Sequence, residues 1–167
     1  CPICKTNLVE KDGNLFCDDC KKEYEVSDGI PILVDFQKIP KHLVDQIRYF
    51  EKEEVIEKDE FRLDEWQKSY VDRFCNNFSE IKGKKVLDCG TGSGYMAVEL
   101  AKKGADVFAC DLTLKGLKRL KKISEKEGLG IKIFCCSAEE IPMKDEFFDY
   151  FISNAVLEHL PNEEEAI

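Results

Sequence analysis

The chain lacks any run of roughly 18 consecutive apolar residues, the length that a membrane-spanning helix requires. It also lacks the positively charged start and apolar core of a secretory leader, so nothing in the sequence indicates export. No part of it is basic, because residues 1–36, 37–82 and 83–167 each hold more acidic than basic residues, and the formal net charge is −9. A broad electrostatic grip on a nucleic acid is therefore not favoured, and only a local basic patch would allow one.

The composition of the 167 residues indicates a folded protein, because 43% of them are apolar and 10% are aromatic. Three regions differ in pattern. Residues 1–36 are rich in cysteine and turn residues, residues 37–82 are charged with apolar residues at helical spacing, and residues 83–167 alternate short apolar runs with helical stretches. We expect a small module, a helical linker or lid region and an α/β domain at these boundaries. Because the chain begins at Cys1 rather than methionine, we also expect its true start to lie upstream.

The nine cysteines fall into two groups. Four form two Cys-x-x-Cys pairs near the start, and five lie in or beside apolar runs further along the chain. Disulfide frameworks are typical of short secreted chains with an even number of cysteines, whereas buried free thiols fit a reducing compartment. We therefore predict a cytoplasmic protein.

The first group, Cys1, Cys4, Cys17 and Cys20, has the spacing of a metal site. A two-residue gap lets both sulfurs of a pair reach one ion, and a hairpin across the intervening 12 residues would bring the pairs together. So short a module cannot build much of a core alone, so a metal would stabilise it. Four protein ligands complete the coordination of Zn²⁺, so the predicted zinc is structural. A redox pair is the alternative, but the module lacks the surrounding βαβ pattern.

The third region reads as alternating strands and helices. Its apolar runs predict strands over residues 85–88, 106–111, 131–135 and 149–153, with helices over residues 95–103 and 114–126. This alternation predicts βαβ units and a parallel sheet.

The first of these strands runs into a glycine-rich turn. Glycines stand at positions 90, 92 and 94, so the third glycine of a dinucleotide fingerprint would fall on Tyr95 or Ala97, and neither register fits. Asp88, two positions before the first glycine, would repel a pyrophosphate but suits a ligand with an ammonium group, such as a methionine moiety. Asp111 ends the next strand, where a carboxylate can accept ribose hydroxyls. The pattern favours S-adenosylmethionine over NAD.

Residues 84–161 resemble the class I S-adenosylmethionine-dependent methyltransferases, in particular the type 11-like group. The segments that carry the resemblance are 86–95, 106–111, 136–149 and 150–161. The resemblance implies a Rossmann-like parallel sheet. It also implies three further strands beyond Ile167, so we expect the sheet to be incomplete at the C-terminal end.

The resemblance further implies roles for individual residues. Those around the first strand would hold the methionine part, those after the second the ribose and adenine, and those after the third the adenine edge. Carried over to this sequence, the cofactor-binding residues are Asp88, Gly90, Thr91, Gly92, Gly94, Tyr95, Asp111, Leu112, Ser137, Ala138, Glu139 and Asn154. Ser137 departs from the family, which often has aspartate there. No catalytic base is identified; for His159 a structural hydrogen bond is favoured over a role as general base.

The N-terminal module, including Tyr24 and residues 28–33, resembles small zinc-ribbon proteins that act as methyltransferase activators. Two functions from different classes follow. The first is a methyltransferase whose acceptor is RNA, a protein or a small molecule, and the second is a cofactor-binding regulatory protein without its own turnover. An NAD-linked oxidoreductase is a third possibility, which the position of Asp88 disfavours.

Overall fold

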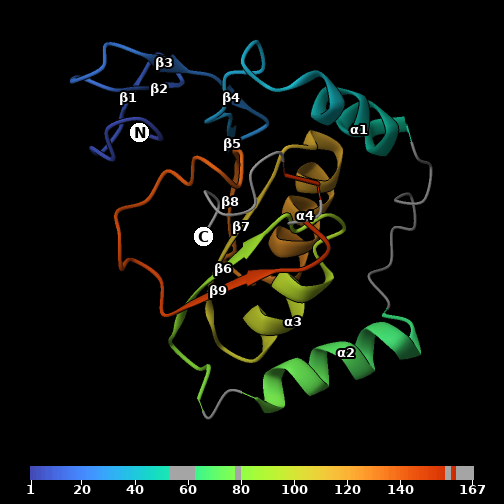
Figure 1. The fold of residues 1–167 in the computed structure, drawn as a ribbon. Coiled ribbons are helices and arrows are strands. Elements are labelled where there is room, and N and C mark those ends of the chain that lie inside the picture. The colour runs from blue at the N-terminus through green and yellow to red at the C-terminus, as the bar shows by residue number, and fades with distance from the viewer. Residues whose placement is uncertain (53–62, 78–79, 157–158, 161–167) are drawn as a thin grey trace.

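The computed structural model describes residues 1–52, 63–77, 80–156 and 159–160 (Figure 1). Five short strands form the N-terminal module, two helices follow, and four strands alternating with two helices form the rest. In chain order these are β1 Val9–Lys11, β2 Asn14–Phe16, β3 Glu23–Tyr24, β4 Val26–Ser27, β5 Ile30–Pro31, α1 Lys41–Lys52, α2 Glu65–Asn76, β6 Lys85–Cys89, α3 Tyr95–Lys102, β7 Asp106–Asp111, α4 Leu114–Glu127, β8 Lys132–Cys135 and β9 Tyr150–Ser153. The predicted strands and helices of the third region are confirmed to within one residue at each end.

The four long strands make one parallel sheet in the order β8-β7-β6-β9. Their registers align, so that Cys89 of β6 pairs with Cys110 of β7 on one side and Ser153 of β9 on the other. The carboxyl ends of all four strands therefore meet at one edge, where ligands of open α/β sheets bind. The predicted α/β class and parallel sheet are confirmed.

Side chains alternate between the two faces of the sheet, as the two-residue period of a strand requires. On one face, Val86, Val107 and Ala109 pack in a buried cluster with side chains of α2, α3 and α4. On the other, Leu87 and Phe108 pack with residues of the segment 136–148 and of the N-terminal module. Figure 1 shows these helices on one side of the sheet and that segment, in orange, on the other.

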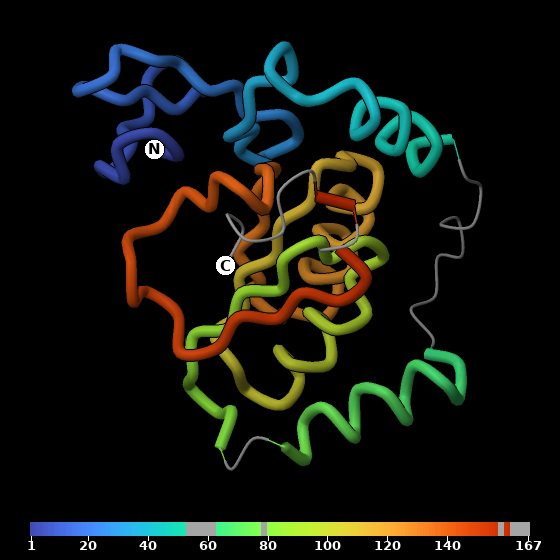
Figure 2. Tube along the Cα trace, viewed as in Figure 1, coloured from blue at the N-terminus to red at the C-terminus, as the bar shows by residue number. Residues whose placement is uncertain are grey.

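The N-terminal module continues directly into the outer edge of the sheet (Figure 2). Strands β1, β2 and β3 form one antiparallel sheet and β4 pairs with β5. Beyond β5, Ile32 forms a parallel bridge with Cys135 of β8, and the Leu33 backbone N–H donates to the Cys135 carbonyl over 2.7 Å. Ile30 is buried against Leu117 of α4. The module therefore covers backbone groups that β8 would otherwise present at an open edge.

Helices α1 and α2 confirm the helical spacing expected between residues 37 and 82. Asp64 caps the N-terminus of α2 in a reciprocal capping box. The Asp64 side chain accepts the Gln67 backbone N–H, and the Gln67 side chain accepts the Asp64 backbone N–H. Trp66 of α2, whose helical spacing favours packing in the core, is instead 60% exposed and stacks on Tyr70. Within the described ranges no helix is long and apolar enough to cross a membrane.

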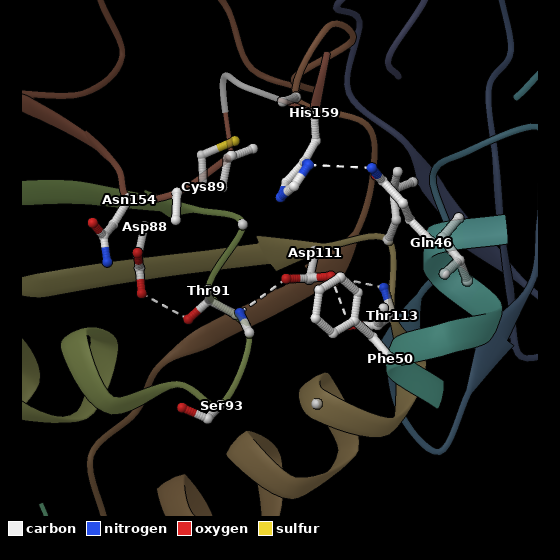
Figure 3. Close-up of a pocket in the computed structure, with 18 of the residues that line it drawn as sticks. Gln46, Phe50, Asp88, Cys89, Thr91, Ser93, Asp111, Thr113, Asn154 and His159 are labelled. Carbon is white, nitrogen blue, oxygen red and sulfur yellow. Dashed lines mark hydrogen bonds between the residues drawn. The ribbon is translucent and has the colours of Figure 1, made fainter. Parts of the chain in front are cut away.

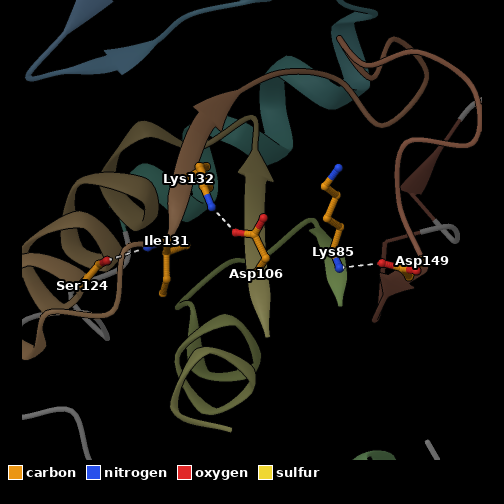
Figure 4. A network of polar contacts seen from close by, with 6 residues as sticks. All are labelled: Lys85, Asp106, Ser124, Ile131, Lys132 and Asp149. Carbon is orange, nitrogen blue, oxygen red and sulfur yellow. Dashed lines mark hydrogen bonds and ion pairs between the residues drawn. The ribbon is translucent and has the colours of Figure 1, made fainter. Parts of the chain in front are cut away.

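The amino-terminal edge of the sheet holds a set of polar contacts (Figure 4). The Lys85 backbone N–H donates to Asp149 over 2.8 Å, and Lys132 forms an ion pair with Asp106. Exposed pairs of this kind add little stability, so their role is to fix the register of neighbouring strand ends. They lie at the opposite edge from the site described next.

Candidate functional site

A cavity of about 460 Å³ opens at the carboxyl edge of the sheet. Helix α1 and the segments after β6, β7, β8 and β9 all contribute to its lining. Nine of the twelve predicted cofactor-binding residues lie in that lining: Asp88, Gly90, Thr91, Gly92, Tyr95, Asp111, Leu112, Ala138 and Asn154. Gly94, Ser137 and Glu139 are not among the lining residues.

Asp88 lies at the base of the cavity and is 3% exposed. The Thr91 hydroxyl donates to its carboxylate over 2.7 Å, which ties the first turn of the loop to the strand (Figure 3). Burial raises the pKa of Asp88 to about 6, because a charged carboxylate loses its hydration there and the Asp111 carboxylate lies nearby. A cation placed beside Asp88 would offset this cost.

Asp111 holds the glycine loop and the start of α4 together (Figure 3). Its carboxylate accepts the Gly92 backbone N–H over 2.9 Å and both the N–H and the hydroxyl of Thr113 over 2.8 and 2.7 Å. Thr113, not Asp111, occupies the N-cap position of α4, so Asp111 is more than a simple helix cap. Because each carboxylate oxygen can accept two hydrogen bonds, acceptor capacity remains for a ligand hydroxyl.

Gly94, although outside the lining, shapes the loop. It begins α3 in the left-handed conformation with φ +80°, and a Cβ there would lie 2.6 Å from a methyl carbon of Leu120. Glycine is therefore required at this position because α3 approaches α4 closely, and not because the residue contacts a ligand.

Ser137 also uses its side chain within its own segment. The residue is 5% exposed, and its hydroxyl accepts the Glu139 backbone N–H over 3.3 Å and donates to the Glu139 carboxylate over 3.5 Å. Ala138 between them lines the cavity. Contacts of Ser137 and Glu139 with adenine stay predictions.

Helix α1 brings one face to the cavity, consisting of Leu43, Gln46, Ile47 and Phe50. Gln46 Nε2 and His159 Nδ1 lie 3.1 Å apart, which joins this helix to the segment after β9 (Figure 3). Phe50 lines the cavity, whereas its neighbour Tyr49 is 59% exposed and does not. Of these two aromatics, only Phe50 is therefore in position to contact a ligand in the cavity.

Two residues outside the motifs from which the site was predicted contribute to it, Tyr70 through Asn154 and Gly116 in the cavity lining. Tyr70 on α2 donates to Asn154 Oδ1 over 3.0 Å, and Asn154 Nδ2 donates to the Tyr95 hydroxyl over 2.9 Å. The sequence indicates only helical spacing for Tyr70, so its link to the site was missed. Gly116 was missed as well, because a glycine inside a helix gives no local signal of what it contacts.

Gly116 of α4 lies against the backbone of the glycine loop. A Cβ at this position would lie 2.5 Å from the Gly92 carbonyl oxygen. We expect Gly116→Ala to displace the loop and to lower the free energy of unfolding by about 1–3 kcal/mol, because backbone cannot yield as a flexible side chain does. Urea unfolding of the two proteins measures the difference. Alanine is the better helix former, so an increase in stability would show that the contact imposes no constraint.

The four N-terminal cysteines come together as their spacing predicts. All four sulfurs lie within 4.8 Å of one another, with 3.5 Å between those of Cys4 and Cys17 and 4.0 Å between those of Cys1 and Cys20. A tetrahedral zinc site with Zn–S bonds of 2.3 Å requires sulfurs roughly 3.8 Å apart. The donor set and its spacing therefore fit Zn²⁺.

Residues 87–167 match the model of a family described as "Methyltransferase domain". A ubiquinone biosynthesis O-methyltransferase of Chromobacterium violaceum is 35% identical over 95 residues, covering 56% of this chain and 41% of that protein. One of Rickettsia prowazekii is 29% identical over 92 residues, covering 55% and 36%. The chain thus spans about two fifths of the length of these curated relatives.

Solved structures show the same fold. A Bacillus halodurans protein assigned as a methyltransferase is 27% identical, with a TM-score of 0.54 over 59% of this chain and 43% of that one. An N-methyltransferase of Haemonchus contortus, in complex with phosphomonomethylethanolamine and S-adenosylhomocysteine, is 25% identical, with a TM-score of 0.55 over 59% and 24%. Residues 87–167 therefore match a methyltransferase family and share the fold of these solved methyltransferases.

Proposed function

We propose that this chain binds S-adenosylmethionine in the cavity at the carboxyl edge of the sheet and transfers its methyl group to an acceptor. The observation that carries the proposal is the placement of two carboxylates, Asp88 and Asp111, on either side of the glycine loop in one cavity. Asp88 would receive the ammonium of the methionine part, and the remaining acceptor position of Asp111 would take a ribose hydroxyl. Leu112 and Ala138 line the part of the cavity left for the adenine.

The bound sulfonium supplies an activated methyl group, which an acceptor atom attacks in line with the breaking bond. The chain's contribution is to position the two groups and to exclude water, which together can provide most of the rate. Residues of α1 and of the described part of the segment after β9 line the cavity and would limit the access of water. His159 stays a structural residue in this proposal, joined to Gln46.

Two matched relatives are named O-methyltransferases, which makes an oxygen acceptor the first to test. We place the protein in the cytoplasm, because all nine cysteines are free and the site requires no oxidised thiol. The four clustered cysteines hold a structural Zn²⁺, for which the sulfur spacing is the support.

Calorimetric titration with S-adenosylmethionine and S-adenosylhomocysteine tests the proposal. We expect the wild-type chain to bind both. Asp88→Ala and Asp111→Ala should each lose at least tenfold in affinity, because each removes a charge-assisted hydrogen bond of about 1.5–3 kcal/mol.

Asp145→Ala provides the control, since it removes an exposed carboxylate outside the cavity lining and should leave the affinity unchanged. Full affinity in both site variants would refute the assignment of the two carboxylates. A fluorescence titration with NADH should show no binding, and saturation by NADH would favour the oxidoreductase instead.

A further inference from the structure

Two tyrosines from different helices hold the side chain of Asn154 at both ends. Tyr70 of α2 donates to Asn154 Oδ1 over 3.0 Å, and Asn154 Nδ2 donates to the hydroxyl oxygen of Tyr95 over 2.9 Å. Asn154 and Tyr95 line the cavity, whereas Tyr70 is not among the lining residues. Tyr70 thus reaches the cavity through Asn154.

The direction of these bonds leaves the hydroxyl proton of Tyr95 unused. A hydroxyl carries one proton, so Tyr70 commits its own to Asn154, and one of the two amide N–H groups of Asn154 is committed to the oxygen of Tyr95. Because Tyr95 is the acceptor of that bond, its own O–H is left to donate elsewhere. In the described part of the chain no hydrogen bond uses that proton. Successive bonds in one direction polarise one another and strengthen the last donor.

The charges of the cavity call for such a donor. An amino acid carries its ammonium and its carboxylate on the same carbon, so the residues that bind them must be neighbours. Asp88 serves the ammonium, and its charge lies close enough to Tyr95 to affect the tyrosine. No lysine or arginine occurs among the described lining residues, whereas the neutral donors Tyr95 and Asn154 do line the cavity. Burial and the nearby carboxylate of Asp88 raise the pKa of Tyr95, so it keeps its proton at neutral pH.

We propose that the Tyr95 hydroxyl binds the carboxylate of the methionine part, and that Tyr70 is a positioning residue that orients Tyr95 through Asn154. This inference rests on the proposed function, because the carboxylate is that of S-adenosylmethionine. It makes α2, which lies outside the matched methyltransferase segment, part of cofactor recognition.

The test compares two probes on the full-length chain with zinc bound. One is S-adenosylhomocysteine, and the other is S-adenosyl-3-thiopropylamine, the same molecule without its carboxylate. The dissociation constant of the amine probe divided by that of S-adenosylhomocysteine measures how strongly the protein selects for the carboxylate. We expect Tyr95→Phe to reduce this ratio roughly tenfold or more and Tyr70→Phe to reduce it a few-fold, with affinity for the amine probe retained in both.

Tyr150→Phe is the matched control, because it removes a hydroxyl from β9 outside the cavity lining and should leave the ratio unchanged. A structural role for Tyr95 or Tyr70 would weaken both probes equally and leave the ratio constant, which would overturn the inference. A ratio that falls in Tyr70→Phe but not in Tyr95→Phe would mean that the hydrogen bonds run in the opposite direction. That result would also overturn the inference. If the wild type bound neither probe, the proposed function itself would fail.

Discussion

Replacing Cys4 with serine should abolish stoichiometric zinc binding and lower the melting temperature by roughly 10 °C or more. The module's strands are two or three residues long, and its core is small, so the metal would supply most of its folding free energy. Loss of the module would also uncover apolar surface, because Tyr24 and Leu33 pack in one cluster with Phe134 of β8. The effect should therefore extend beyond the module to the sheet.

Elemental analysis and thermal unfolding of the purified chain measure the two effects. Cys75→Ser is the matched control, since Cys75 lies on α2 outside the four-cysteine cluster and should leave one zinc per chain in place. A strong chelator should lower the melting temperature of the wild type but not that of Cys4→Ser. Retention of zinc by Cys4→Ser, or an unchanged melting temperature after zinc loss, would contradict the prediction.

Replacing Asp88 with asparagine should stabilise the empty protein above pH 6 by about 3 kcal/mol. The folded-state pKa of about 6 lies above the ordinary value of 3.8, so the folded protein binds the proton more tightly than the unfolded chain. The protonated form of Asp88 therefore contributes to the free energy of unfolding of the wild type below pH 3.8, and this contribution is lost progressively as the pH rises towards 6. Asparagine mimics the neutral acid and can still accept the Thr91 hydroxyl, so this loss should disappear in the variant.

Urea unfolding of both proteins between pH 3.5 and 8 gives the difference in stability directly. It should be near zero at the acid end and reach a plateau above pH 6. Asp149→Asn is a control of opposite sign, because the Lys85 backbone N–H lowers the pKa of Asp149, so its contribution is present at neutral pH and lost on acidification. A difference for Asp88→Asn that is constant with pH would mean that ionisation of Asp88 costs nothing. The same variant should weaken cofactor binding, so stability and function oppose each other at this residue.

The sequence predicts the strands of the α/β domain well, because each buried strand is a short apolar run bounded by glycine or charged residues. It also predicts which side chains follow those strands, and parallel pairing then brings Asp88 and Asp111 into one cavity. Tyr70 and Gln46 could not be found in this way, because they reach the site from helices distant in the chain. Nor could the exposure of Trp66, since helical spacing does not reveal which turn faces solvent.

The pairing of Ile32 with Cys135 bears on how the protein should be dissected experimentally. A fragment beginning after residue 36 would lack the backbone that forms hydrogen bonds with the outer edge of β8. It would also lack Ile30, which is fully buried against α4. Such a fragment would present a bare strand to other molecules and would be prone to self-association. Expression boundaries for the α/β domain should therefore retain residues 30–36, even where the four clustered cysteines are removed.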